Sequence, residues 1–190
     1  MASKIKVDTL ETANGSGTIA LSNQLSGMTT ASLPALGSAQ MPSGSVIQVT
    51  QGMTNSAVTT SSTTHVDTGL SASITPTSTS SKILVTVTQQ LNASNNIRNA
   101  GADVKLLRGS TTVLDNGNNL GYGSFYRDIN ISGTTNIDTG AVVAFSYIDS
   151  PSTTSATTYK TTGRSQVTGN PILFQSYGGH SVITLQEIKG

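Results

Sequence analysis

The sequence predicts an all-β protein, and three observations lead to that prediction. Roughly three residues in ten are Ser or Thr, and Thr favours strands because its branched Cβ stiffens χ1 and fits a pleated surface. The 190 residues include 19 Gly and many Asn, which favour turns. No segment of ten or more residues has the apolar spacing that an amphipathic helix requires.

From residue 44 onward, strand-like segments recur at intervals of about 8–15 residues, the spacing expected of a β-sandwich or jelly roll. The clearest segment is KILVTVTQQL, where Ile83, Val85 and Val87 share one face and the intervening threonines share the other. The other segments are SVIQVT, THVDTG, SASIT, ADVKLLRG, TTVLD, YGSFYRDINI, AVVAFSYID, TTYKTTG, ILFQ and HSVITLQEI. We therefore expect an antiparallel β-sandwich over residues 43–190.

Turn and loop signals separate these segments. The sequence DNGN at 115–118 predicts a tight turn, because Asn-Gly tolerates positive φ. Two Ser/Thr-rich runs, TPTSTSS at 75–81 and SPSTTSATT at 150–158, each lead directly into a strand-like segment. We interpret both runs as loops at one end of the sandwich rather than as boundaries between domains.

The N-terminal part of the chain is predicted to be a separate segment, residues 1–42. KIKVDTLE alternates in the manner of a strand, and a turn at 14–17 leads to a second short strand, TIAL. An isolated two-stranded hairpin is marginally stable in water, so these strands need a partner surface. The following residues, rich in Gly, Ser and Pro, read as a linker with one helical turn near Leu33–Leu36.

The charge content is low and limits the possible partners. Only 10% of residues are charged, compared with about 25% in ordinary globular chains, and the net charge is +1. Scattered Lys and Arg argue against nucleic-acid binding, and no apolar run has the length of a membrane span or a secretory signal. The absence of Cys excludes disulfides and thiolate metal sites. Strand edges with so few charges are poorly protected, so we expect another copy of the chain to cover them.

Two Asp-Thr-Gly stretches could be either the active site of an aspartic protease or ordinary turns at the ends of strands. TTHVDTGL contains Asp67 and TTNIDTGA contains Asp138, and such motifs supply the paired carboxylates of aspartic proteases. The apolar pair followed by Gly, which must support each protease loop, is missing after both motifs. We favour the alternative that two strands end in the same turn, the Asp side chain capturing backbone N–H groups two residues on.

The remaining candidate residues point to binding rather than catalysis. His65 and His180 have no acidic neighbours at metal-ligand spacing, and no carboxylate pair suggests glycoside hydrolysis, so we expect no metal, cofactor or catalytic residue. Tyr122 and Tyr126 lie in a Gly-rich stretch and could form a platform for a sugar, although core packing is the alternative. Tyr177 and His180 lie in a second Gly-rich stretch. These four residues are our candidate receptor contacts.

Several phrases of the sequence resemble virion structural proteins of tailed bacteriophages, in particular the small fibre and tail-fibre-like proteins of marine phages. They are SKIKVDTLETANGSGTI, STTHVDTGLSASITPTSTSSKILV, VKLLRGST, FSYIDSPSTTSATTYKT and SVITLQEI. The resemblance covers most of the chain but includes no catalytic motif. It implies a homotrimer with a jelly-roll-like C-terminal sandwich and an N-terminal segment that attaches to the virion.

The expected function is therefore that of a non-enzymatic virion protein, most simply a short trimeric tail fibre that contacts the host surface through its sandwich loops. Its expected partners are copies of itself, other tail or capsid proteins and a host glycan or protein, and its expected location is the virion. The alternatives are a capsid or tail decoration protein without receptor binding and, more remotely, an aspartic protease or sugar-cleaving enzyme. The residues assigned to virion attachment are Lys4, Ile5, Lys6, Val7, Thr9 and Leu10.

Overall fold

A computed structural model describes residues 37, 40–95, 99–115, 124–128 and 137–190. The chain divides between Gly37 and Ser38, a few residues before the predicted boundary at 42. The predicted N-terminal strands, the linker with its helical turn, and the DNGN turn after Asp115 lie outside the described residues, as do Tyr122 and all six predicted attachment residues.

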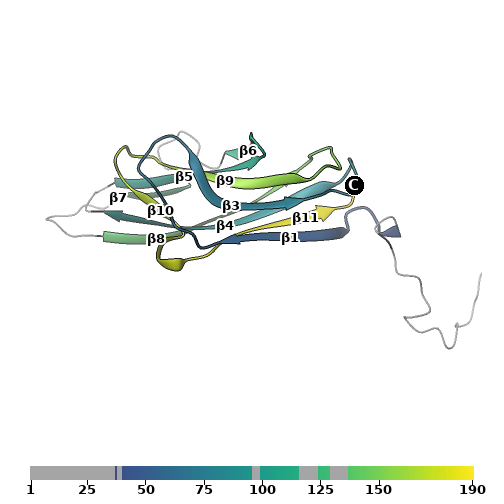
Figure 1. Cartoon of the computed structure of the whole chain (residues 1–190), viewed down its shortest axis with the longest axis horizontal. Helices are drawn as coiled ribbons and strands as arrows, with labels where there is room; N and C mark the ends of the chain where they lie inside the picture. The colour runs from purple at the N-terminus through teal and green to yellow at the C-terminus, as the bar shows by residue number, and fades with distance from the viewer. Residues whose placement is uncertain (1–36, 38–39, 96–98, 116–123, 129–136) are drawn as a thin grey trace, which may run out of the picture. The chain divides into compact units, whose positions relative to one another are not determined.

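The C-terminal part is all-β, as predicted, and consists of two antiparallel sheets that form two layers (Figure 1). Sheet A has the strand order β1-β11-β4-β8, with the short strands β10 and β2 continuing beside the second half of β4. Its strands are β1 (Val46–Thr54), β2 (Val58–Thr60), β4 (Lys82–Asn95), β8 (Ile137–Asp149), β10 (Ile172–Phe174) and β11 (Ser181–Ile188).

Sheet B has the strand order β3-β9-β5, and β6 and β7 share the far edge of β5. Its strands are β3 (Val66–Ile74), β5 (Asn99–Arg108), β6 (Thr111–Asp115), β7 (Phe125–Asp128) and β9 (Thr157–Ser165). The predicted segments THVDTG and SASIT belong to one strand, β3, which continues through a β-bulge between Asp67 and Ser71. The short strand β2 was not predicted, because three residues give too little alternation to recognise.

The core lies between the two sheets and follows the alternation of their strands. Inward-facing aliphatic residues of β3, β4, β5 and β11 form one apolar cluster with the buried Tyr159. A second cluster lies around Phe174 and Leu91, nearer the other end of β4. Gln89, which is fully buried, faces inward between Val87 and Leu91, where the first cluster gives way to the second.

Buried polar groups around Gln89 satisfy each other. Its amide oxygen accepts a hydrogen bond from Thr161 Oγ1 (2.9 Å), and its amide nitrogen donates to Ser181 Oγ (2.9 Å). Thr161 Oγ1 also shares a hydrogen bond with Thr68 Oγ1 (2.5 Å). The network therefore joins β3 and β9 of sheet B to β4 and β11 of sheet A. The buried polar side-chain atoms of its four members all have hydrogen-bond partners.

The edges of the two sheets meet along β1 and β3. Thr50 Oγ1 donates to the carbonyl oxygen of Ser73 (3.1 Å), and Gln48 Nε2 donates to that of Thr75 (3.1 Å). Gly52 is required here, because a Cβ at this position would overlap the backbone carbonyl of Ser71. This side of the sandwich is therefore closed without ladder pairing between the sheets.

The two Ser/Thr-rich runs lie at one end of the sandwich, as predicted. Residues 75–81 connect β3 to β4, and residues 150–156 connect β8 to β9. The register places their flanking residues together, because Ile83 is opposite Asp149 and Ile74 is opposite Thr157.

A buried carboxylate, that of Glu187, connects several segments of the chain at this end of the sandwich. Glu187 is fully buried and accepts hydrogen bonds from the amide (2.7 Å) and hydroxyl (2.8 Å) of Thr77 and from Gln48 Nε2 (3.0 Å). Burial by itself raises the pKa of Glu187, but hydrogen bonds from Ser81, Thr77 and Gln48 outweigh it and hold the pKa below its ordinary value.

Candidate functional site

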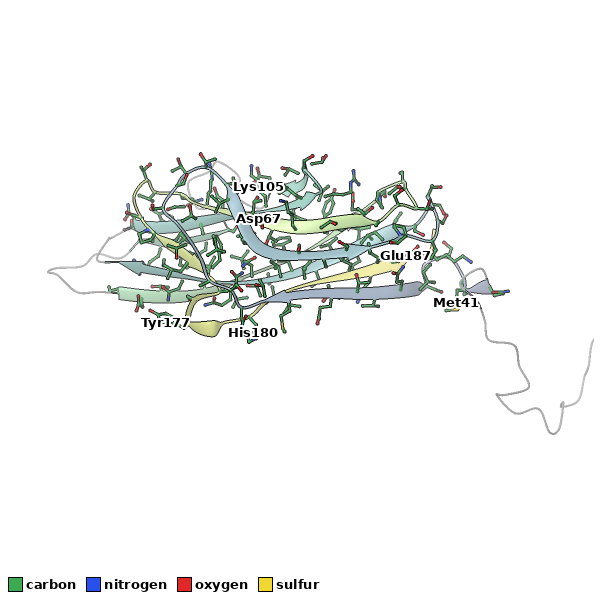
Figure 2. All side chains as sticks on the ribbon, in the orientation of Figure 1. Met41, Asp67, Lys105, Tyr177, His180 and Glu187 are labelled. Carbon is green, nitrogen blue, oxygen red and sulfur yellow. The ribbon has the colours of Figure 1, made fainter. Side chains whose placement is uncertain are left out.

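The four predicted receptor contacts do not form one site. Tyr177 and His180 lie in the connection between β10 and β11, on the side of sheet A (Figure 2). Tyr126 lies on β7 of sheet B, opposite Gly101 in the ladder, and a Cβ at Gly101 would lie 3.0 Å from the Tyr126 ring. The two tyrosines therefore belong to different sheets, and Tyr122 lies outside the described residues.

Tyr177 is the most exposed large hydrophobic residue in the described part of the chain, with 81% of its surface accessible. It sits in a 3-10 turn, η3 (Ser176–Gly178), and its φ of 53° is in the left-handed region, as is that of Gln175 at 52°. Left-handed backbone at a residue other than Gly costs on the order of 1–3 kcal/mol and persists only where the surroundings enforce it. The fold thus holds Tyr177 in an unfavourable backbone conformation while exposing its ring.

Buried partners hold this turn in place. Gln175 N donates to Gln90 O (3.1 Å), and Gln90 Nε2 donates to Ser176 Oγ (3.0 Å). The fully buried amide of Gln175 is best satisfied when Nε2 donates to the carbonyls of Ser56 (3.1 Å) and Thr68 (3.2 Å) and Oε1 accepts from Ser181 Oγ (2.9 Å). The base of the turn is therefore fixed to β4 and β11, and only Tyr177, Gly178 and His180 are strongly exposed.

The Tyr177 hydroxyl reaches the second Asp-Thr-Gly stretch. It donates to Asp138 Oδ2 across 3.3 Å, and Asp138 is exposed near the start of β8. This aspartate was predicted to end a strand, but the strand begins at Ile137 and runs through Gly140 without a turn. The prediction of a shared turn is wrong for Asp138, because the apolar alternation extends from Ile137 to Tyr147 and carries the stretch into the ladder with β4.

Asp67 does make the predicted local turn. Its Oδ1 accepts a hydrogen bond from the amide of Gly69 (2.9 Å), two residues on, and Gly69 has a φ of 78°. Burial raises the pKa of Asp67, but the hydrogen bond from Lys160 and the amide of Gly69 outweigh it, so the pKa lies below its ordinary value. The turn forms the bulge inside β3 rather than the end of the strand.

The two aspartates face solvent on different sheets. Asp67 alternates with the buried Thr68 and Leu70 and therefore points outward from sheet B, whereas Asp138 points outward from sheet A. A protease pair needs two carboxylates close enough to share a proton. The fold does not bring these two together.

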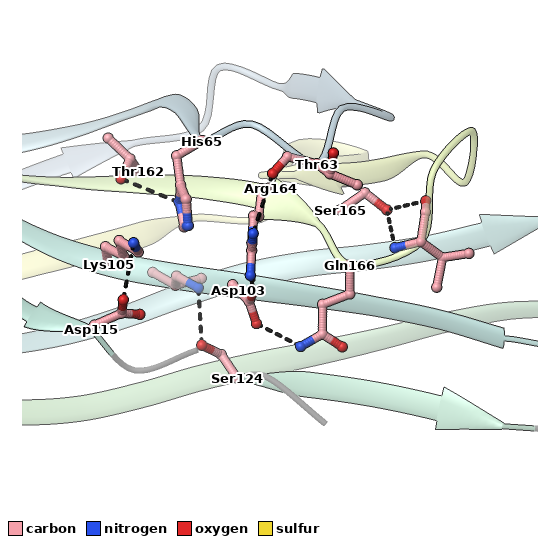
Figure 3. Close-up of polar contacts among 12 residues, drawn as sticks. Thr63, His65, Asp103, Lys105, Asp115, Ser124, Thr162, Arg164, Ser165 and Gln166 are labelled. Carbon is pink, nitrogen blue, oxygen red and sulfur yellow. Dashed lines mark hydrogen bonds and ion pairs between the residues drawn. The ribbon is translucent and has the colours of Figure 1, made fainter. Parts of the chain in front are cut away.

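A polar cluster on the outer side of sheet B was not predicted (Figure 3). Asp103 on β5 is fully buried, and its Oδ2 accepts from Arg164 Nε (2.6 Å) and forms an ion pair with Nη2 (2.5 Å). Its Oδ1 accepts from Gln166 Nε2 (2.6 Å). The carboxylate therefore has a two-pronged partner on β9 and a neutral donor, which is the arrangement that makes a buried charge tolerable.

His65 lies beside this cluster. Its Nδ1 is 3.5 Å from Thr162 Oγ1, and its buried Nε2 has no hydrogen-bond partner among the described residues (Figure 3). Burial lowers the pKa of His65, and the charges of Lys105 and Arg164 lower it further. The imidazole is thus neutral at neutral pH and packs against two cations that already have carboxylate partners, since Lys105 pairs with Asp115 (2.9 Å).

The cluster has the character of a structural ion-pair ladder. His65 contacts only the Thr162 hydroxyl, at the long distance of 3.5 Å, among the hydrogen-bond partners of the described residues, and each basic group named has an acidic partner. No group of His, Asp or Glu residues in the described ranges could hold a metal ion, and no helix there is long and apolar enough to cross a membrane. No family model matches the chain, and no curated protein matches it. Among the described residues, the candidate site with exposed aromatic and polar side chains is therefore the Tyr177 turn and its neighbours on sheet A.

Proposed function

We propose that this chain is a non-enzymatic structural protein of a tailed-phage virion, a short homotrimeric fibre that contacts the host surface through its C-terminal sandwich. The strand order supports a jelly roll: strands distant in sequence pair with each other, as in β1-β11, β4-β8 and β3-β9. The chain also changes sheets after most of its strands. Jelly rolls recur in viral capsid and lectin domains, so this order favours a virion role.

The observation that carries the proposal is the outer face of sheet A. We define the A face by twelve outward residues on β1, β11, β4 and β8: Val49, Gln51, Met53, Val182, Thr184, Gln186, Leu84, Thr86, Thr88, Ala144, Ser146 and Ile148. None of them is charged. Val49, Met53 and Ile148 are each more than half exposed, and the register places Leu84 directly opposite Ile148 and Met53 directly opposite Val182.

The area of the A face is a substantial part of the area that a standard protein interface buries. Four strands about 4.8 Å apart, each covered over roughly 20 Å by its three outward residues, span on the order of 400 Å² in projection, whereas a standard interface buries about 800 Å² per partner. Relief of the side chains adds to the projected area, and in a trimer each copy has two neighbours. An uncharged patch of this extent favours contact with another protein surface over exposure to water.

The edge strand β8 supports the same proposal. It is 13 residues long and pairs on one side with β4, while no described strand pairs with its other side. Between Asp138 and Asp149 it carries no charge and no Pro, and Val142 is 60% exposed. Long, flat, uncharged edges invite pairing with another chain, so a soluble protein with such an edge needs a cover for it.

Self-association is tested by the mass of the full chain in solution at micromolar concentrations, measured by analytical ultracentrifugation. We expect three copies for the wild type and one copy for Thr86→Lys, which places a charge at the centre of the A face. Thr112→Lys, on the exposed surface of sheet B, is the matched control and keeps three copies. A wild type that stays monomeric would contradict the proposal, and a dimer would contradict its trimeric form.

Attachment to the virion is tested by removing residues 1–42. We expect the shortened chain to remain folded and trimeric but to be absent from purified particles, because the predicted N-terminal strands pair with a partner by strand addition. Immunoblotting of particles detects incorporation, and circular dichroism and sedimentation report folding and mass. A shortened chain that unfolds, or that joins particles normally, contradicts the assignment of residues 1–42 to attachment.

A further inference from the structure

The connection between β2 and β3, residues 61–65, lies at the end of sheet B away from the two Ser/Thr-rich runs. Its first four residues are exposed, and only His65 among the five is partly buried. Backbone carbonyls of the connection accept three hydrogen bonds from β9 and the residues after it: Ser62 O from Ser165 N (2.9 Å), Ser61 O from Gly169 N (3.2 Å) and Thr63 O from Arg164 Nη1 (3.3 Å). His65 therefore supplies the side chain that packs this connection against the sheet.

The His65 ring lies among charged groups from three strands (Figure 3). Lys105 and Asp103 come from β5, Arg164 from β9, and Asp115 from β6. Lys105 is paired with Asp115, and Arg164 is paired with Asp103. Each carboxylate named here thus already has a cation as its partner, and none of them is bonded to the imidazole.

One further ion pair lies on the same face of sheet B. Lys160 of β9 is 2.8 Å from Asp67 of β3, and the Asp67 side chain is 51% exposed. This pair is likewise complete without the imidazole. A charge on His65 would therefore have to compete with an existing ion pair for any of these carboxylates.

The surroundings of the ring fit its neutral form and oppose its charged form. Nδ1 lies 3.5 Å from Thr162 Oγ1, and the buried Nε2 has no hydrogen-bond partner among the described residues. Protonation would make both ring nitrogens donors and place a charge beside two cations. The Thr162 backbone and the Asp103 carboxylate favour the charged ring, but burial and the charges of Lys105 and Arg164 outweigh them, so the pKa of His65 lies below its ordinary value of 6.5.

We propose that His65 is an acid-sensitive latch at this end of sheet B: the neutral ring holds residues 61–65 against β9, and protonation turns the ring into solvent and releases the connection. The exposed residues that precede His65 give the ring a path to water that does not cross the core. Release also breaks the bonds that the carbonyls of residues 61–63 accept. The latch lies on sheet B and operates without the A face, so it goes beyond the proposed function and does not depend on it.

The direction of the pKa shift gives the pH range in which the latch opens. The released ring has the ordinary pKa of 6.5, whereas the packed ring has a lower one. The released form therefore binds protons more readily, so the packed form is fully favoured above about pH 6.5 and loses this advantage as the pH falls below that value. At about pH 5, roughly 1.5 units lower, the equilibrium constant for opening can have risen by at most about thirtyfold.

The latch is tested by hydrogen exchange of the full-length protein at about pH 7.5 and about pH 5, followed by NMR and corrected for the intrinsic effect of pH on exchange. We expect protection of the Ser165 and Gly169 amides to fall by about five- to thirtyfold in acid, because their acceptors belong to the released connection. The Gly109 amide donates to Thr158 O (2.8 Å) at the other end of sheet B, and its protection should change by less than about twofold.

Three variants assign the response to His65. His65→Gln cannot titrate in this range and is expected to show no acid effect at Ser165 or Gly169. His180→Gln removes the only other histidine of the chain, which lies on the side of sheet A, and this matched control should respond as the wild type does. Lys105→Gln removes one of the two cations that lower the pKa of His65, so we expect a smaller acid response, and this variant provides the test if His65→Gln does not fold.

The same measurements can overturn the latch. Protection of Ser165 and Gly169 that acid leaves unchanged in the wild type excludes it, and so does an acid response that persists in full in His65→Gln or in Lys105→Gln. An equal loss of protection at Gly109 also excludes it, since that pattern indicates unfolding of the whole sandwich rather than release of one connection.

Discussion

The outer faces of the two sheets are opposite in character, although they come from one chain of uniform composition. The twelve residues of the A face carry no charge, and the charged outward residues of sheet A, Lys82 and Asp138, lie beyond it at opposite ends of β4 and β8. The outer face of sheet B, which we term the B face, carries an ion pair on each of its principal strands: Asp67 with Lys160, Lys105 with Asp115, and Asp103 with Arg164. Charges are scarce in this chain, and the sandwich places most of the paired ones on one side. The few charged residues are therefore distributed unevenly between the two faces. The A face, which has none, is suited to contact with another protein surface.

The exposed apolar residues show the same division. Val46, Val49 and Met53 lie on β1, and Val142 and Ile148 lie on β8, so both flanks of sheet A display large aliphatic side chains. The B face instead presents Ser, Thr and charged side chains along β3 and β9. If the A face is an interface between copies, its apolar side chains are removed from water in the assembly. The polar and charged side chains of the B face then remain exposed and keep the assembly soluble.

The largest effect is expected from breaking the buried pair on the B face. Asp103→Asn leaves Arg164 without its carboxylate and turns an amide N–H group toward donors, because Asp103 accepts from both Arg164 and Gln166. We expect the free energy of unfolding to fall by about 3–5 kcal/mol. Urea unfolding of wild type and variant at pH 7 measures it.

Asp115→Asn is the control for that measurement. It breaks the Lys105 pair, whose carboxylate is 46% exposed, and a pair of that kind contributes less than about 1 kcal/mol. Equal losses in the two variants would show that burial of Asp103 does not set the strength of its pair, and the B face would then be a collection of surface contacts.

A smaller effect is expected at the end of the sandwich, where Glu187 is buried and forms no ion pair with any described residue. Glu187→Gln replaces a charged acceptor of two Thr77 donors with a neutral amide, and the free energy of unfolding at pH 7 is expected to fall by about 1–3 kcal/mol. The pKa of Glu187 lies below the ordinary value of 4.5 when the chain is folded. Its contribution is therefore complete above about pH 4.5 and is lost as the pH falls below that value.

The pH dependence provides the control. Between pH 7 and pH 3, wild-type stability should fall more than that of Glu187→Gln, so the two denaturation midpoints converge in acid. A difference that stays constant with pH would mean that the substitution acts through packing, and the carboxylate would have no special role.

The pair between Asp67 and Lys160 is expected to contribute less still. The Asp67 side chain is 51% exposed, and Asp67→Asn keeps an oxygen for the Gly69 amide while losing the ion pair, so the loss should be below about 1 kcal/mol. Thermal unfolding at low and high salt measures the change. A loss of several kcal/mol, or one that salt does not reduce, would show that this part of the B face depends on the turn rather than on charge.

Alternation in the sequence was enough to predict most of the fold. KILVTVTQQL and SVITLQEI carry strict period-two patterns, and both are strands with the expected buried faces, β4 and β11. The turn at Asp67 was also predictable, because Asx-turn chemistry is local. By the same logic the identical tripeptide at Asp138 was misread: what decides its structure is pairing with β4, which lies 44 residues earlier in the chain (138 minus 94, from the partners Ser94 and Asp138).

The candidate sites depend on register, which the sequence does not contain. Asp103 and Arg164 face each other because β5 and β9 pair at that point. The pair has no local signal, since its members are far apart and of ordinary type. Tyr177 was a candidate on composition alone, but its hydrogen bond to Asp138 is seen only in the folded chain, because 39 positions separate the two residues.

The smallest expected effect is the most direct test of the difference between the two faces. If copies associate through the A face, their association should not weaken between about 50 and 500 mM NaCl, because no charge is present there to screen. Sulfate should strengthen it slightly, since excluded salts favour burial of apolar surface. Sedimentation equilibrium of the wild type across this range measures the association constant. A tenfold or greater loss of association in high salt would place the interface on the charged B face instead, and the A face would then need a different partner.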